Sequence, residues 1–142
     1  MAKRTSEAQW EGTLQDGKGR FWTASGEVSG VYSAGTRFEE QEGTNPEELI
    51  GAAHASCFSM ALAADLEKAG HRPESVRTVA TVTLLKGDAG WAITGIDLDA
   101  QAQVPGVDDA EFQRIAEGTR TGCPVSRALS AVPITLKAAL IP

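Results

Sequence analysis

The sequence predicts an α+β fold in a single domain that spans residues 1–142. Segments near both ends alternate polar and apolar residues, as strands do, whereas one long central segment is apolar on all sides, as a buried helix is. Strands and helices come in blocks rather than in a regular βαβ order, and no linker or repeat divides the chain. At 142 residues, the chain is long enough to bury a core without disulfides.

The N-terminal third predicts a β-hairpin followed by a short third strand. Residues 7–15 alternate loosely, residues 16–19 carry a turn signal, and β character resumes at residues 20–23. A short strand is expected around residues 30–33. Residues 35–40 are then expected to form a loop or a strand end.

The central helix has clear start and stop signals. Asn45 suits the N-cap, Pro46 the first helical position, and Glu48 the third position of a capping box. The helix should run to about Ala69 and stop at Gly70.

From residue 49 to residue 64 this helix is apolar or small all round, which predicts burial on most sides at the centre of the fold. The uncharged run is shorter than the roughly 20 residues that span a bilayer. Residues 1–10 contain no apolar stretch of the signal-peptide kind. We therefore expect a cytoplasmic protein without a membrane partner.

The second half predicts two long strands, residues 76–85 and 91–104, joined by a turn. A change of side-chain parity near Gly95 predicts a bulge in the second strand. Two helices and a last strand should follow: a helix capped by Asp108 or Asp109, a short helix at 124–129, and a strand at 134–140.

The charge balance limits the partners. The formal net charge is −6, and Lys and Arg are scattered rather than clustered. A nucleic-acid partner is therefore not expected, because binding to a phosphate backbone needs a basic patch.

Cys57 lies in the middle of the apolar helix and allows two interpretations. A buried Cys is commonly a small hydrophobic residue, and burial raises the pKa of its thiol. Ala and Ser are plentiful in this helix, however, so packing does not require sulfur. His54 lies three residues earlier on the same helix face, where it would either activate the thiol or form a hydrogen bond in the core.

Cys123 directly precedes Pro124, which places its thiol at or beside a helix N-cap. Free N–H groups and the helix dipole favour a thiolate there, and a plain turn is the alternative. In the cytosol, a bridge from Cys57 to Cys123 would be transient, and thus catalytic or regulatory. The two Cys and two His residues lack zinc-site spacing, so no metal or other cofactor is expected.

Arg37 and Glu48 are further candidates. A buried thiolate needs a cation, and Arg37 precedes the helix; a surface arginine is the alternative interpretation. Glu48 would orient Arg37 through a bidentate pair, although the capping box alone explains a Glu there. Nine residues of regular helix place Glu48 and Cys57 about 180° apart. Glu48 would therefore act only through Arg37 or through a bend near Gly51.

Three segments together resemble the OsmC/Ohr family, and most closely its osmotically inducible OsmC branch. GTNPEELIGAAHASCFSMAL at residues 43–62 is very similar to the signature helix of that family. TRFE at residues 36–39 and GCPVS at residues 122–126 match its other two motifs, in the same order. The resemblance covers nearly the whole chain.

The resemblance implies a thiol peroxidase that reduces organic hydroperoxides to alcohols and protects against oxidative and osmotic stress. Cys57 would be the peroxidatic and Cys123 the resolving cysteine, with Arg37 and Glu48 activating Cys57. A lipoyl-type dithiol would reduce the disulfide. The family fold is an intertwined homodimer, with antiparallel β-sheets wrapped around central buried helices. One alternative is a dimer that uses the same disulfide to sense redox state or to bind a ligand, without turnover. Another alternative is a structural dimer whose cysteines are incidental.

Overall fold

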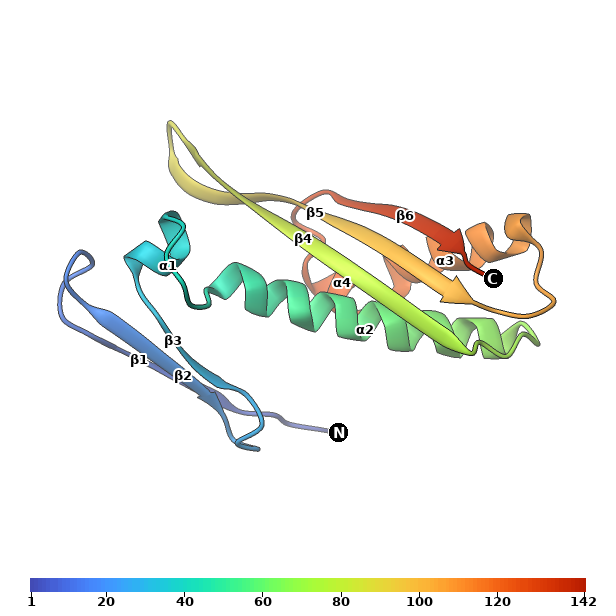
Figure 1. The fold of residues 1–142 in the computed structure, drawn as a ribbon, viewed down its shortest axis with the longest axis horizontal. Helices are drawn as coiled ribbons and strands as arrows, with labels where there is room; N and C mark the ends of the chain where they lie inside the picture. Colours follow the sequence, from blue (N-terminus) through green and yellow to red (C-terminus); the bar gives the residue numbers. More distant parts are fainter. The chain divides into compact units, whose positions relative to one another are not determined.

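The computed structural model describes residues 1–142, which form two compact units, residues 1–49 and 50–142. Each unit contains one three-stranded sheet (Figure 1). The α+β class is confirmed, whereas the single domain stays a prediction.

The first unit contains an antiparallel sheet of β1 (Ser6–Glu11), β2 (Lys18–Thr23) and β3 (Ser29–Tyr32), in that order. The predicted hairpin and third strand are confirmed. Gly19 pairs with Tyr32, and a Cβ at Gly19 would lie 2.3 Å from the Tyr32 ring. The missing side chain at Gly19 therefore leaves room for the Tyr32 ring, whose centroid lies 5.6 Å from that of the Trp10 ring.

A one-turn helix, α1 (Ala34–Phe38), replaces the loop or strand end that we expected there. The Ser33 side chain accepts from the Thr36 N–H at 3.2 Å, and the Thr36 hydroxyl accepts from the Ser33 N–H at 2.9 Å. This reciprocal capping box stabilises a single turn. The prediction was wrong because Thr, rather than the usual Glu or Gln, takes the third position.

The central helix α2 (Pro46–Lys68) agrees with its predicted bounds to within one residue. At its start, the Glu48 N–H donates to Asn45 Oδ1 at 2.9 Å, as the N-cap pattern predicts. Past its end, Gly70 has a φ of +89°, and the His71 N–H donates to the Leu66 carbonyl at 2.9 Å. Glycine adopts this left-handed conformation without steric cost, which is why the helix stops there.

The second unit contains β4 (Ser75–Gly87), β5 (Gly90–Gln103) and β6 (Ile134–Leu140). β4 and β5 pair in antiparallel fashion, and Thr94 is the extra residue of a bulge beside Gly95, as predicted. β6 pairs with β5 in parallel, which corrects the expectation of purely antiparallel sheets. A parallel pair needs a long crossover, and the chain supplies one with α3 (Asp109–Gly122) and α4 (Pro124–Ala128) (Figure 1).

The core of this unit lies between α2, β5 and α3. Fully or almost fully buried side chains from these elements form one cluster: Phe58, Leu62 and Leu66 of α2, Ile96, Leu98, Ala100 and Ala102 of β5, and Phe112, Ile115 and Ala116 of α3. Every fourth residue of α2 from Phe58 thus faces the core, as one face of a helix does.

The other face of α2 remains exposed in the single chain. It carries small and apolar residues: Ala52, Ala53, Ser56, Met60 and Ala64. The expected burial on most sides is therefore wrong for one chain by itself. By length and composition alone α2 is also sufficient to cross a membrane, a test that core helices pass as well.

Candidate active site

The structure brings Cys57 and Cys123 together, although 66 positions separate them in the chain. Their Sγ atoms lie 3.0 Å apart, and both thiols are free. Cys57 comes from the middle of α2 and is half-buried, whereas Cys123 is only 1% exposed. Two reduced sulfurs from different elements therefore meet at hydrogen-bond distance.

Local sequence explains why Cys123 lies at a helix junction. It is the C-cap of α3 and the N-cap of α4, and its N–H donates to the Thr119 carbonyl at 2.9 Å. Pro124 has no N–H and excludes helical geometry from the residue before it, so α3 must end at Cys123. The proline also suits the first position of α4. The break turns the thiol toward α2.

The surroundings affect the two thiols differently. Burial opposes a thiolate at Cys123, but hydrogen bonds from Cys57, Ser126 and Val125 outweigh it and lower the pKa of Cys123. Burial raises the pKa of Cys57, and its hydrogen bond with Cys123 adds to this, against a weaker opposing bond from the Val125 N–H. Of the two thiols, Cys123, beside the first amides of α4, therefore ionises more readily than Cys57.

His54 is fully buried, and its ring Nε2 lies 2.7 Å from Ser126 Oγ. Nδ1 has no hydrogen-bond partner, and burial lowers the pKa of the ring, so His54 is neutral near pH 7. Of the two interpretations of His54, the structure supports the hydrogen-bonded core residue rather than an activator bonded to Cys57. Sequence reasoning did not select Ser126, although its place three residues after Cys123 is typical of a side chain beside a helix N-cap.

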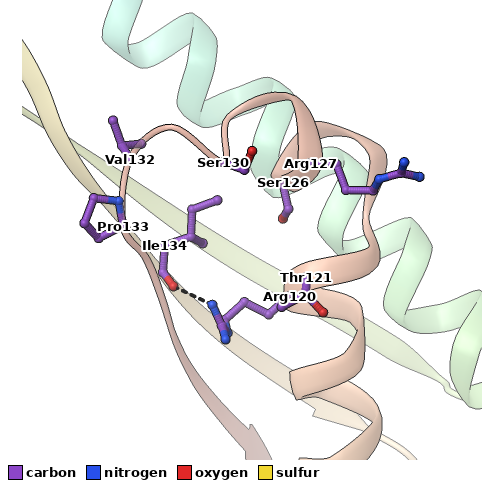
Figure 2. A pocket seen from close by; sticks show the side chains of 8 residues that line it. All are labelled: Arg120, Thr121, Ser126, Arg127, Ser130, Val132, Pro133 and Ile134. Atoms are coloured by element: carbon purple, nitrogen blue, oxygen red, sulfur yellow. Dashed lines mark hydrogen bonds between the residues drawn. The ribbon is translucent and has the colours of Figure 1, made fainter.

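A pocket of about 440 Å³ lies beside Ser126 (Figure 2). Arg120 and Arg127 also line it, which gives the pocket a basic wall. Arg120 is already engaged, because its guanidinium donates to the Ile134 carbonyl at 2.9 Å and pairs with Glu117. No group of three or more His, Cys, Asp or Glu side chains is arranged to hold a metal ion.

In the other unit, Arg37 is held by Glu47. Its Nη2 lies 2.8 Å from one carboxylate oxygen of Glu47, and its Nε is 3.3 Å from both oxygens. Glu48 instead accepts from the Thr44 hydroxyl at 2.9 Å and is exposed. The expected pairing of Glu48 with Arg37 is therefore wrong. Consecutive helical residues point about 100° apart, so only one of the two can face α1.

Two free thiols in hydrogen-bond contact, one on α2 and one at the junction of the crossover helices of an α+β fold, form a candidate thiol redox site. The sequence model of the OsmC-like protein family matches residues 39–137. The chain is 50% identical over 129 residues to peroxiredoxin OsmC of Escherichia coli (strain K12), which covers 90% of each chain. The protein belongs to the OsmC-like family, as the sequence motifs indicate.

Further relatives agree with this membership. Organic hydroperoxide resistance protein OhrA of Bacillus subtilis (strain 168) is 32% identical over 102 residues, or 70% of each chain. The crystal structure of OhrB of Bacillus subtilis superposes with a TM-score of 0.76 at 23% identity, covering 95% of this chain and 98% of that one. At that identity the likeness shows the shared fold.

Proposed function

We propose that this protein is a thiol peroxidase that reduces organic hydroperoxides to alcohols, with Cys57 as the peroxidatic and Cys123 as the resolving cysteine. The observation that carries the proposal is the 3.0 Å separation of two free thiols from different elements of one chain. The names of the relatives support the substrate class, because they include a peroxiredoxin and organic hydroperoxide resistance proteins.

The first step is the attack of the Cys57 thiolate on the distal peroxide oxygen. The O–O bond breaks, the alkoxide takes a proton and leaves as the alcohol, and Cys57 becomes a sulfenic acid. Cys123 then attacks the Cys57 sulfur, the S–O bond breaks, and hydroxide leaves as water. The sulfurs need to approach by only about 1 Å to reach the length of a disulfide bond.

Ionisation of Cys57 requires a further positive group, because burial and Cys123 both raise the pKa of its thiol. We propose that Arg37 is this group and that Glu47, rather than Glu48, orients it. A nearby guanidinium favours the thiolate and stabilises negative charge on the departing oxygen. Arg37→Ala should therefore raise the pKa of Cys57, measured by thiolate absorbance in a Cys123→Ser background. An unchanged pKa would exclude Arg37 from this role.

A homodimer is the assembly that we propose, with the exposed face of α2 packed against its copy. That face carries Met60, which is 73% exposed, among alanines and serine that allow close approach of a second helix. Met60→Lys should shift the mass measured by light scattering toward the monomer, because a charge would be buried at the contact. A wild-type protein that is monomeric at micromolar concentration would exclude this assembly.

A dithiol of the lipoyl type is the proposed reductant, which would open the disulfide by thiol exchange. Transient disulfides of this kind suit a reducing cytoplasm, where we place the protein. Its role would be protection against oxidative and osmotic stress.

The test is a steady-state assay of cumene hydroperoxide consumption with dihydrolipoamide as reductant. Wild-type protein should turn over repeatedly, and Cys57→Ser should be inactive. Full activity in Cys57→Ser would end the peroxidase proposal. Cys123→Ser should form one sulfenic acid per chain and then accumulate overoxidised Cys57, visible by mass spectrometry. Formation of the disulfide in wild type without turnover would instead identify a redox sensor.

A further inference from the structure

We infer that His54 is a positioning residue for Cys123: its ring donates from Nε2 to Ser126 Oγ, and this turns the single hydroxyl proton of Ser126 onto the Cys123 sulfur. The inference rests on the proposed function and adds a group to its resolving step. The Nδ1 atom of His54 has no hydrogen-bond partner and takes no part in the mechanism proposed above.

The three side chains form a continuous buried row that joins α2 to the junction of α3 and α4. His54 is 0% exposed, Ser126 is 2% exposed and Cys123 is 1% exposed. His54 Nε2 and Ser126 Oγ lie 2.7 Å apart, across 72 positions of sequence. Ser126 lies one turn after Cys123 at the start of α4, and its side chain is among the groups that lower the pKa of the Cys123 thiol. All three side chains are almost fully buried, so their polar atoms depend mainly on their protein neighbours.

The unpartnered Nδ1 decides which ring nitrogen carries the proton. A buried N–H without an acceptor is rarer and more costly than a buried acceptor without a donor. The proton therefore resides on Nε2, where Ser126 Oγ accepts it, and Nδ1 keeps only a lone pair. A doubly protonated ring would bury an unpaired N–H, and burial indeed lowers the pKa of His54.

No charged side chain offsets that effect. Burial alone shifts the pKa of His54. Besides His54, the titratable groups here are Cys123, which belongs to the row, and Cys57 of α2, which is bonded to Cys123. Arg120 of α3 and Arg127 of α4 line the pocket beside Ser126, and both are cations that would oppose protonation of the ring. His54 is therefore a neutral hydrogen-bond donor.

A serine hydroxyl has one proton and can donate only once. Since Nε2–H donates to Ser126 Oγ, the Ser126 proton is free to point at its other neighbour, the Cys123 sulfur. This bond and the amide N–H groups of Val125 and Ser126 lower the pKa of Cys123 against the effect of burial. Without His54, the hydroxyl would lose the neighbour that fixes its direction.

The lowered pKa of Cys123 affects the resolving step, in which Cys123 forms the disulfide. The Cys123 thiolate attacks the Cys57 sulfur of the sulfenic acid, the S–S bond forms and the S–O bond breaks. Cys123 is oxidised, Cys57 is reduced from sulfenic acid to disulfide, and the departing hydroxide takes a proton to become water. A larger thiolate fraction at Cys123 shortens the life of the sulfenic acid, which protects Cys57 from overoxidation.

The first test measures the pKa of Cys123 by thiolate absorbance in a Cys57→Ser background. Ser126→Ala should raise this pKa by about one unit, since a hydrogen bond to a charged group is lost. Ser126→Thr keeps the hydroxyl and should retain the parent value. An unchanged pKa in Ser126→Ala would overturn the inference. Circular dichroism and thermal melting establish that each variant is folded.

The second test separates His54 from Ser126 with a pair of substitutions. His54→Leu should raise the pKa of Cys123 as Ser126→Ala does, whereas His54→Gln restores an N–H donor near Nε2 and should rescue it. The double variant of His54→Leu and Ser126→Ala should shift no further than Ser126→Ala alone, because both changes remove one bond. Additive shifts would mean that His54 does not act through Ser126.

The third test follows the resolving step directly. After one equivalent of cumene hydroperoxide, dimedone trapping reports sulfenic acid, and mass spectrometry of quenched samples reports the disulfide. Where the pKa of Cys123 exceeds the pH, Ser126→Ala should close the disulfide about three- to fourfold more slowly, since a tenfold smaller thiolate fraction is partly offset by higher nucleophilicity.

The outcomes of this kinetic test distinguish the two proposals. If the parent protein forms no sulfenic acid, the peroxidase proposal fails. If the parent forms the sulfenic acid and the disulfide, and Ser126→Ala closes at the parent rate, only the role of Ser126 and His54 fails.

The tautomer itself is measurable by ¹⁵N NMR of the imidazole ring. His71, the other histidine of the chain, pairs with Glu111 and can be replaced as His71→Gln to leave one ring signal. We expect the Nε2–H form of His54. A ring protonated at Nδ1 would overturn the inference, because Ser126 would then have to donate to His54.

Discussion

Glu47→Gln is the substitution that tests most directly how Arg37 is positioned. Glu47 is 7% exposed and receives three hydrogen bonds from the Arg37 guanidinium. Glu48, the next residue, is exposed and bonds only to groups at the start of its own helix, the Thr44 hydroxyl and Asn45. Glu48→Gln is therefore a matched control, because the chemical change is the same and the guanidinium contact is absent.

The expected magnitude follows from the geometry of these contacts. The 2.8 Å contact is a strong charge-assisted bond, whereas the two at 3.3 Å share one N–H and are weak. A bond between charged groups contributes about 1.5–3 kcal/mol to stability. The Arg37 side chain is 36% exposed, and solvent screening reduces this to about 1 kcal/mol. Glu48→Gln should cost less than about 0.5 kcal/mol, because it weakens only an exposed interaction with the helix start.

Two assays measure the effect. Urea unfolding should give a free energy of unfolding about 1 kcal/mol lower for Glu47→Gln than for wild type. The rate at which Cys57 reacts with cumene hydroperoxide should fall about fivefold, if the same energy orients Arg37 for the reaction. Equal effects of the two substitutions, or a larger effect of Glu48→Gln on either measurement, would refute the assignment of Glu47 as the partner of Arg37.

Three further predictions concern packing and pH. Leu62→Ala should lower the free energy of unfolding by about 2–5 kcal/mol, because Leu62 is fully buried in the core cluster; a loss below 1 kcal/mol in urea titration would contradict that packing. The unfolded chain binds a proton at a higher pH than buried His54, so stability should fall as the pH drops below about 6.5. His54→Gln should flatten this slope, and an unchanged slope would mean that another group causes it. Gly19→Ala should displace the Tyr32 ring, whose carbons occupy the place of the new Cβ, and lower the melting temperature, whereas Gly26→Ser meets no neighbouring atom and measures the cost of its positive φ alone.

Local sequence patterns predicted most of the features that have a local cause. The bounds of α2 follow from Asn45, Pro46 and Gly70, and the bulge follows from the parity change at Gly95, because caps and side-chain alternation act within a few residues. The helix α1 was missed although its cause is also local. Its capping box uses Thr36, which is not among the usual residues at that position.

The sequence did not predict which of several possible partners a residue or a strand contacts. Glu47 and Glu48 are identical in type and adjacent in sequence, and the direction in which each leaves the helix decides which one meets Arg37. The parallel pairing of β6 depends on the path of α3 and α4 rather than on the residues of the strand. Ser126 gave no chemical signal of its own.

The sequence by itself determined the order of the elements other than α1, the two thiols and the family, because the motifs that carry them are short and contiguous. Only the tertiary structure decided that Cys57 lies 3.0 Å from Cys123 and that His54 meets Ser126 across 72 positions. Contacts of this kind arise when a helix packs beside a sheet and a crossover. Their partners are set by the packing of whole elements, which no local pattern of residues records.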